Sequence, residues 1–394
     1  MRKIKSSGTS KKGILTAITF VLLLTACGRS EQPTPSSLRA SPASSKETPA
    51  VITLLPEQHY GDKLQMQDKR QKLYHFITTE LSGTAGIYTN LQDTEQTAEL
   101  TTGHEMLSES AGLMMRYKAL TQQKSAFEAE WTLAKQTFNM EAAFSYRFSP
   151  KLQKRYTLNA AVDDLRIIRA LYEASDVFQS EAYMQEADSF GKRFYEHNVK
   201  NGYLYDFYDE TYKITNDFIT LCYIDLKTLG LLPIEAGERQ TLIASMEKII
   251  KDGYLSDEFP FYETRYDYGA GKYSSDHINM VESLLTVLAL AEMGEEKAES
   301  IRYIKERVKA GTLYGQYTRE GAATTDTRST AIYAITAMIG SVIGDQTLYA
   351  DSIGKMNEFQ IEEVGSSLLG GFGDTAAQQA YSFDNLMALL AYTY

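Results

Sequence analysis

Acidic, amide and hydroxyl side chains stand at the start of several strongly apolar segments of this chain. The positions are Ser108-Glu109, Asp163-Asp164, Asn216-Asp217, Asn279, Ser329-Thr330 and Asp384-Asn385. Any one of them is suited to cap a helix, because Ser, Asp and Asn accept hydrogen bonds from the free N–H groups of a first helical turn. Carboxylates from several such positions that share one depression would repel one another, and such arrangements are usually kept for acid–base chemistry. The set therefore contains candidates for a catalytic cleft.

Tyrosine is the second chemical feature, with 27 residues in the chain. Aromatic rings crowd two loops, residues 202–208 and residues 259–273. Rings mixed with carboxylates suit a carbohydrate, since a pyranose stacks on an aromatic face while its hydroxyls bond to polar side chains. The candidate substrate-binding side chains are Tyr205, Tyr208, Tyr266, Tyr273, Asp163, Asp217 and Asp384. Ordinary packing between helices is the alternative explanation for many of these tyrosines.

The elements that would position these groups follow from spacing. The polar pairs recur with successive gaps of 55, 53, 63, 50 and 55 residues, and each gap holds a more polar amphipathic segment. The predicted amphipathic helices are residues 66–81, 126–139, 182–196, 238–251, 298–309 and 348–359. Six buried apolar helices ringed by six amphipathic ones form an all-α (α/α)6 toroid, with all inner-helix starts at one end. A two-helix solenoid of the same period is the alternative.

The N-terminal segment has the pattern of an export signal. Residues 1–26 combine a basic start, a short apolar run and small residues before a cleavage site. Cys27 follows directly, which resembles the lipobox of bacterial lipoproteins, so we expect it to carry lipid such as palmitate on the extracellular face of the bacterial membrane. An uncleaved spanning helix is the alternative, but the apolar run is shorter than roughly 20 residues. Residues 27–56 predict a disordered Ser/Pro-rich tether, and residues 57–394 a single catalytic domain.

Charge and cysteine content exclude other classes of function. Removal of the signal takes five of the 40 basic residues and none of the 51 acidic ones, which leaves a net charge of −16. This excess of acidic residues argues against nucleic acid as a partner, because proteins bind nucleic acid by neutralising its phosphates with Lys and Arg. Two cysteines and five scattered histidines predict no disulfide framework and no metal site, and we expect no cofactor. We expect a monomer whose partners are a polysaccharide and, through the lipid, the membrane.

The segment around Glu109 resembles glycoside hydrolase family 8. Leu-Ser-Glu-Ser-Ala-Gly-Leu-Met-Met, at residues 107–115 and followed by Phe127 and Trp131, is similar to that family's Ser-Glu-Gly-x-Gly-Tyr-Gly-Met segment. The resemblance covers most of residues 60–394, implies the same (α/α)6 fold, and places the general acid on Glu109. The family's Gly-Tyr-Gly stretch is replaced by Ala-Gly-Leu in this chain.

A second segment carries the resemblance further. Ala-Val-Asp-Asp-Leu-Arg-Ile-Ile-Arg-Ala-Leu, at residues 161–171, resembles the family's Ala-Thr-Asp-Ala-Asp-x-x-Ile-Ala-x-Ala-Leu segment. The family's aspartates there hold the substrate in a distorted ring conformation, a role that the resemblance gives to Asp164. Val162 stands where the family has its first Asp, so Asp163 is the candidate for the role of that first Asp.

The catalytic base is less closely defined. Tyr266-Asp267 is similar to the Tyr-Asp that supplies the family's base, which implies that Asp267 activates water. The family's Arg-x-Pro after the base is absent, and Glu263 competes for the role. The family resemblance implies hydrolysis with inversion of the anomeric configuration. This reaction requires the carboxyl groups of the acid and the base to stand roughly 6.5–9.5 Å apart.

These features predict an endo-acting, inverting hydrolase of a β-linked surface polysaccharide or exopolysaccharide. Among the members of the family, the chain looks most like the divergent surface-anchored type associated with bacterial exopolysaccharide. Two alternatives stay open: a glycan-binding lipoprotein without catalysis on the same fold, and another toroid enzyme such as a polysaccharide lyase. A lyase needs basic or tyrosyl groups to neutralise a uronate, which the acidic helix starts fit poorly.

Overall fold

The computed structural model describes residues 54–96 and 101–394. The predictions for residues 1–26 and Cys27 therefore lie outside the described residues. The described residues belong to one compact unit. In the described part of the chain, no helix is both long enough and apolar enough to cross a membrane.

Five apolar helices make the inner layer of the fold, and each begins within two residues of a predicted start. They are α3 (Ser108–Leu120), α5 (Ala161–Phe178), α9 (Met280–Ala291), α11 (Thr330–Val342) and α13 (Ser382–Ala391). In α11 every residue from Thr330 to Ser341 is buried, as an apolar helix surrounded by other helices requires. The prediction of buried inner helices is confirmed at these five positions.

An amphipathic helix covers the outside of each repeat, as predicted. These outer helices are α2 (Gln67–Thr79), α4 (Lys124–Phe138), α6 (Glu181–Asn198), α8 (Ala236–Asp252), α10 (Ala298–Ala310) and α12 (Gln346–Asn357). The short α1 (Tyr60–Lys63) precedes them, and Tyr60 N donates a 2.7 Å hydrogen bond to the carbonyl of Tyr394. The beginning and the end of the described domain therefore lie together.

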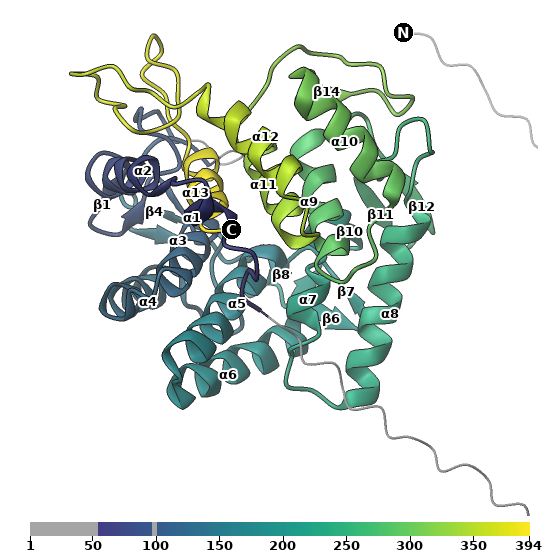
Figure 1. Cartoon of the computed structure of the whole chain (residues 1–394). Helices are drawn as coiled ribbons and strands as arrows, with labels where there is room; N and C mark the ends of the chain where they lie inside the picture. Colours follow the sequence, from purple (N-terminus) through teal and green to yellow (C-terminus); the bar gives the residue numbers. More distant parts are fainter. Residues whose placement is uncertain (1–53, 97–100) are drawn as a thin grey trace, which may run out of the picture. The chain divides into compact units, whose positions relative to one another are not determined.

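Neighbouring inner elements contact one another around a closed ring (Figure 1). α3 packs against α5, α9 against α11, α11 against α13, and α13 against α3. The short α7 (Leu226–Leu229) contacts both α5 and α9 and completes the circle. The contact between α13 and α3 excludes an open solenoid, in which the first and last repeats lie apart. The (α/α)6 toroid is confirmed.

The third inner element differs from the prediction, because no helix begins at Asn216-Asp217. The chain instead forms strand β10 (Phe218–Thr220), a 3₁₀ turn η1 (Leu221–Tyr223) and then α7. Asp206 accepts 2.6 Å hydrogen bonds from both the N and the Oγ1 of Thr220, and β10 pairs with β11. These long-range bonds satisfy backbone groups that a helix would need for itself, so the predicted inner helix is wrong at this position.

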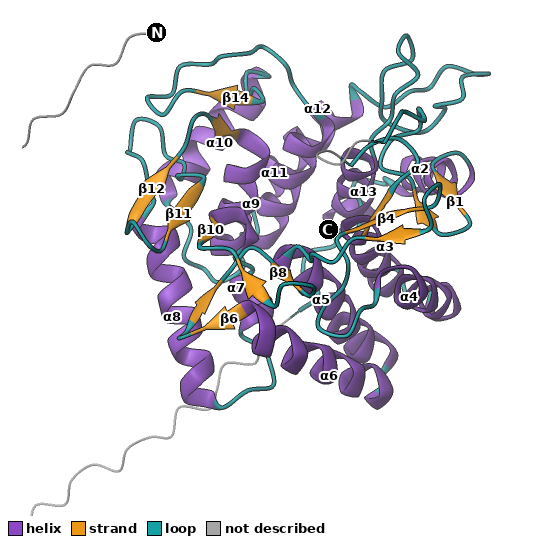
Figure 2. Cartoon of the chain, turned by 180° about the vertical axis from the view of Figure 1, so that it is seen from behind, coloured by secondary structure: helices purple, strands orange, loops and turns teal. Residues whose placement is uncertain are grey.

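Short hairpins connect the helices, and Figure 2 shows them beside the helical ring. Their strands are β1 (Ser82–Gly83), β2 (Gly86–Ile87), β3 (Met106–Leu107), β4 (Arg147–Ser149), β5 (Lys154–Arg155), β6 (Val199–Lys200), β7 (Tyr203–Leu204), β8 (Tyr208–Asp209), β9 (Ile214–Thr215), β11 (Arg265–Asp267), β12 (Lys272–Ser274), β13 (Ile278–Asn279) and β14 (Gln316–Tyr317). β3, β4 and β5 form one three-stranded sheet, and β10, β11 and β12 form another. All pairings between neighbouring strands of these sheets are antiparallel. Both tyrosine-rich loops of the sequence therefore run through hairpins.

A buried ion network ties the inner elements together away from their starts. Arg116 of α3 donates to Glu173 of α5 at 2.8 Å, and its Nη2 also donates to the Tyr394 hydroxyl at 3.1 Å. Arg169 bonds Glu173 at 3.1 Å and Glu292, which follows α9, at 2.8 Å. A buried ion that loses its partner is strongly destabilising, so this network favours one arrangement of the ring.

Candidate active site

The starts of α3, α5, α9 and α13, together with η1, enclose a cavity of about 290 Å³. Its charged lining consists of Glu109, Asp163, Arg166 and Glu282. Its aromatic lining consists of Tyr146, Tyr223 and Phe383. Four of the six predicted helix starts therefore meet at one hollow, which carries acidic groups and aromatic rings. A hollow of this composition suits a sugar, since rings cover the apolar face and charged groups bond the hydroxyls.

Glu109 and Asp163 are joined by one arginine. Arg166 Nη1 donates to Glu109 Oε2 at 3.0 Å and to Asp163 Oδ1 at 2.7 Å. The hydroxyl of Ser108 donates to the other oxygen of Asp163, at 3.4 Å. Asp163 and Arg166 are one helical turn apart on α5, so α5 supplies two of the four members of this chain of contacts and α3 supplies the other two.

Burial makes Glu109 a proton donor near neutral pH. Loss of solvent raises the pKa of Glu109 to about 7, although Arg166 acts in the opposite direction. The nearby charges of Asp163 and Asp384 raise it further. Burial likewise raises the pKa of Asp163, against the stabilising bonds from Arg166 and Ser108. A carboxyl group with such a pKa can hold a proton and release it during catalysis.

A glycine allows α3 and α5 to approach closely behind these residues. A methyl group built on Gly112 would lie 3.0 Å from Cβ of Arg166 and 3.3 Å from N of Ile167. Gly112 stands one turn after Glu109 on the same helix. Any larger side chain at this position pushes apart the two helices that carry the acid and its arginine.

Glu282 is the carboxylate of this cavity that the sequence analysis missed. It stands in the first turn of α9, where Asn279 caps the helix by accepting a 2.9 Å hydrogen bond from Val281 N. Burial raises the pKa of Glu282, Arg265 lowers it, and Asp206 raises it again. Its position in the sequence could have revealed it, because Glu282 is the single charged residue in the apolar helix Met280–Ala291.

Asp164 points away from the cavity that contains its neighbour Asp163. Its Oδ2 accepts a 3.2 Å hydrogen bond from the backbone N of Phe144. Burial raises the pKa of Asp164 to about 7, and the charge of Arg193 acts against this. Val162 and Asp163 both line the cavity, whereas Asp164, about 100° further around the helix, does not. The structure therefore does not bring the predicted catalytic Asp164 to Glu109.

The two candidate bases of the sequence analysis also lie outside the cavity lining. Asp267 ends β11 and accepts a 2.5 Å hydrogen bond from Ala270 N in the turn of its own hairpin. Glu263 is buried, pairs with Arg319, and accepts a 2.6 Å hydrogen bond from the Ser275 hydroxyl. Both carboxylates therefore have structural partners.

The predicted acidic substrate-binding residues have different surroundings. Asp384 lies close enough to Glu109 to raise its pKa, and its Oδ1 accepts a 2.9 Å hydrogen bond from Ala331 N. Asp217 is exposed in the turn before β10, where its carbonyl accepts a hydrogen bond from Tyr268 N. Asp384 is thus near the acid, whereas Asp217 does not line the cavity.

The four predicted tyrosines do not line the cavity. Tyr208 is buried and packs against His197, with 4.7 Å between ring centroids. Tyr205 packs against Tyr268 at 4.8 Å. Tyr266 and Tyr273 border a separate groove along α8. Both loops fold into hairpins that pack on each other and on α8, which keeps these four tyrosines out of the lining of this cavity.

The cavity instead takes its rings from residues that the sequence analysis did not single out. Tyr146 precedes β4, Tyr223 ends η1, and Phe383 lies in the first turn of α13. Of these three rings, only Phe383 had a signal in the sequence, because it stands next to the predicted binding residue Asp384. Among residues 54–96 and 101–394, no group of three or more His, Cys, Asp or Glu side chains has an arrangement that could hold a metal ion.

Comparisons with known proteins add independent information. No family model matches the chain. A structure described as a novel alpha-amylase from Clostridium perfringens is 33% identical, with a TM-score of 0.77 over 82% of this chain and 97% of that chain. The Bacillus subtilis (strain 168) protein named "Putative lipoprotein YdaJ" is 28% identical over 299 residues, 72% of this chain and 78% of that protein.

Two more distant structures share the fold. PssZ from Listeria monocytogenes is 19% identical, with a TM-score of 0.63 over 81% of this chain and 93% of its own. Endoglucanase Cel10 from Klebsiella pneumoniae, a family 8 glycosyl hydrolase, is 14% identical, with a TM-score of 0.57 over 81% of this chain and 97% of its own. The fold of this chain therefore also occurs in an endoglucanase of glycosyl hydrolase family 8.

Proposed function

The chain belongs to glycoside hydrolase family 8, and we propose that it is an inverting, endo-acting hydrolase of a β-linked bacterial exopolysaccharide or surface polysaccharide. The observation that carries this proposal is the cavity in which Glu109, Asp163 and Glu282 surround a hollow lined by aromatic rings. The acidic lining favours a neutral or cationic sugar chain.

Glu109 is the general acid of the proposed reaction. With a pKa of about 7, its carboxyl is substantially protonated at neutral pH and donates this proton to the glycosidic oxygen as the bond breaks. Arg166 then stabilises the carboxylate that forms, because its Nη1 already lies 3.0 Å from Oε2. The arginine therefore makes proton release easier without removing the effect of burial.

Glu282 is the base that we assign in place of Asp267 and Glu263. It lines the same cavity as Glu109 from a different helix, whereas the other two carboxylates do not. In an inverting hydrolase the base activates a water molecule on the opposite face of the sugar from the acid. Opposed positions on α3 and α9 fit these two tasks.

Asp163 takes the role of holding the sugar ring that the family resemblance assigned to Asp164. Of these adjacent aspartates, only Asp163 lines the cavity. Ser108 and Arg166 fix its two oxygens, which keeps the side chain in one orientation for a hydroxyl of the substrate. Such fixed polar groups favour a distorted ring over a relaxed one.

Membrane attachment through Cys27 is the second part of the proposal. The lipobox-like sequence before Cys27 supports it, as does the lipoprotein name of the Bacillus subtilis relative. A labelled fatty acid fed to cells should appear on the wild-type protein and not on Cys27→Ser. Retention of the label by Cys27→Ser contradicts the anchor.

An α-glucan is a second candidate substrate, because the 33% identical Clostridium perfringens structure is described as an alpha-amylase. The decisive experiment incubates the protein with amylose, β-glucans, xylan and purified bacterial exopolysaccharides and measures new reducing ends. The sugar that reacts identifies the linkage, and proton NMR of the first products gives the anomer. Binding without new reducing ends from any polymer would instead favour a non-catalytic glycan-binding lipoprotein.

A further inference from the structure

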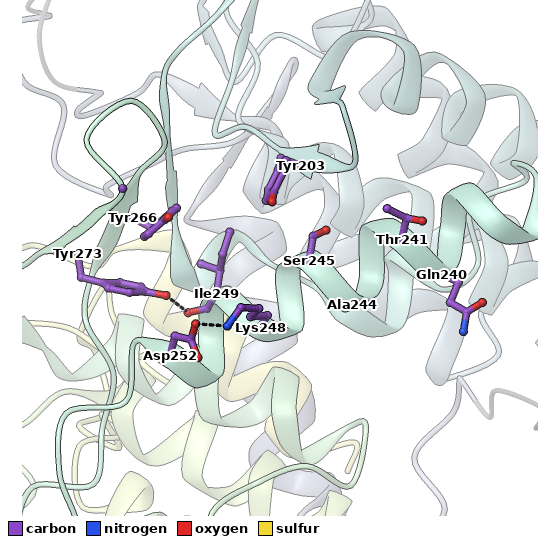
Figure 3. Close-up of a pocket in the computed structure, with 11 residues that line it drawn as sticks. Tyr203, Gln240, Thr241, Ala244, Ser245, Lys248, Ile249, Asp252, Tyr266 and Tyr273 are labelled. Carbon is purple, nitrogen blue, oxygen red and sulfur yellow. Dashed lines mark hydrogen bonds and ion pairs between the residues drawn. The ribbon is translucent and has the colours of Figure 1, made fainter. Parts of the chain in front are cut away.

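A second groove lies outside the cavity that contains Glu109, and the two share no lining residue. This groove has a volume of about 650 Å³ and runs along α8 (Figure 3). Its aromatic side is formed by Tyr203 of β7, Tyr266 of β11 and Tyr273 of β12. Its size falls within the range of roughly 300–1,000 Å³ that is usual for ligand sites.

The three rings are held in place by the hairpins and by α8. Tyr266 and Tyr273 stand opposite each other in the β11–β12 ladder, with ring centroids 4.8 Å apart. The hydroxyl of Tyr273 donates a 2.7 Å hydrogen bond to the carbonyl of Ile249 on α8. Tyr203 packs against Tyr268 of the β11–β12 hairpin, with 5.4 Å between ring centroids, and remains 39% exposed. Rings fixed in this way lose little conformational freedom when a ligand stacks on them.

The opposite side of the groove is polar but carries little net charge. α8 contributes Gln240, Thr241, Ser245, Lys248 and Asp252, at intervals that place them along one side of the helix. Lys248 and Asp252 form an ion pair at 2.6 Å, so their charges compensate each other. Amide and hydroxyl groups facing tyrosine rings match a neutral sugar chain, which has apolar ring faces and many hydroxyls.

We propose that this groove is a second glycan-binding site, which holds a neutral stretch of the polysaccharide chain while another stretch occupies the Glu109 cavity. The proposal rests on the proposed function, because a polymer long enough to reach both sites is the hydrolase's substrate. Two attachment points on one chain raise the affinity for polymer without any change in the catalytic groups. Short oligosaccharides, which cannot span both sites, gain nothing from the groove.

Native affinity electrophoresis of the full-length protein tests this site. The gels contain hydroxyethyl cellulose, xylan or amylose, and every protein carries Glu109→Gln, so that turnover does not alter the polymer. We expect retardation in at least one gel, and a dissociation constant raised at least about fivefold by Tyr203→Ala. Ser245→Trp, which fills the groove, should have the same effect. Tyr212→Ala removes a tyrosine that is 73% exposed in the β8–β9 turn and should change nothing.

Retardation by none of the three polymers overturns the second site, and so does retardation that is equal in the parent, Tyr203→Ala and Ser245→Trp. Hydrolysis is measured separately with Glu109 intact. Binding that depends on Tyr203, combined with no hydrolysis of any polymer, contradicts the proposed function but leaves the groove. Normal hydrolysis of polymer by Tyr203→Ala, with an unchanged KM, contradicts the groove but leaves the hydrolase.

Discussion

Arg166 Nη1 lies 3.0 Å from Oε2 of Glu109, and this contact opposes the effect of burial on the pKa of the proposed acid. Burial raises the pKa of Glu109 to about 7, while the guanidinium lowers it. Removal of the positive charge therefore allows the pKa to rise further, and the acid keeps its proton to higher pH.

Arg166→Gln should accordingly shift the alkaline limb of the kcat/KM profile to higher pH than in the wild type, where we expect it near pH 7. The measurement is a pH–rate profile on the polysaccharide that the enzyme cleaves. Arg193→Gln is the matched control, because Arg193 affects the pKa of Asp164 and not that of Glu109. An unmoved alkaline limb in Arg166→Gln would show that Glu109 is not the group that titrates.

The assignment of the base separates three carboxylates. Glu282→Gln should lower kcat by about 10²–10⁴-fold, as expected for loss of a general base, while Asp267→Asn and Glu263→Gln should retain most activity. Initial rates on one polymer, with melting temperatures alongside, distinguish catalysis from folding. A normal rate for Glu282→Gln together with an inactive Asp267→Asn would return the base to Asp267.

The two adjacent aspartates provide a sharp comparison. Asp163→Asn should lower kcat, because the side chain faces the cavity and would contact the sugar. Asp164→Asn should leave kcat almost unchanged, since Asp164 bonds the backbone of Phe144 instead. Steady-state kinetics of both variants check this, and loss of activity in Asp164→Asn alone would contradict the assignment.

Glu109→Gln has a predictable effect on stability as well as on rate. The pKa of Glu109 is higher in the folded protein than its ordinary value of 4.5, so the folded protein retains a proton that the unfolded chain releases. Stability due to this group is therefore present below pH 4.5 and is lost as the pH rises through about 7. At pH 8 the variant should melt at the same temperature as the wild type or higher, by calorimetry. A markedly lower melting temperature would favour a structural role for Glu109.

Local patterns predicted the ring, because each outer helix has its own amphipathic face and each inner helix is apolar on all sides. The third inner helix could not be predicted in this way. Thr220 is held by Asp206 and β10 pairs with β11, and neither contact has a local signature around residue 216. Tertiary hydrogen bonds overrode the polar pair at that position.

The candidate site was predictable to the same extent. Glu109 and Asp163 were found because a polar group at the start of an apolar helix stands out in the sequence. Glu282 was overlooked because a first-turn glutamate also suits the helix dipole. The motif around Asp267 does not reveal that Ala270 N closes a turn onto this carboxylate. Motif similarity gives no information on the direction in which each side chain points.

Glu292 provides the test of how the ring is stabilised. Burial alone would raise the pKa of Glu292, but the charge and hydrogen bonds of Arg169 hold it at about 2. A depressed pKa contributes stability above the ordinary value of 4.5, and this stability is lost as the pH falls toward 2. Glu292→Gln leaves Arg169 without this charged partner in the interior, which should cost about 3–5 kcal/mol at pH 7. Urea unfolding at several pH values should show that the difference in unfolding free energy from the wild type shrinks below pH 4.5.

Glu358→Gln is the control, because it breaks the more exposed pair with Arg328 and should cost less than about 1 kcal/mol. Equal losses in the two variants would mean that the buried network does not hold the ring together.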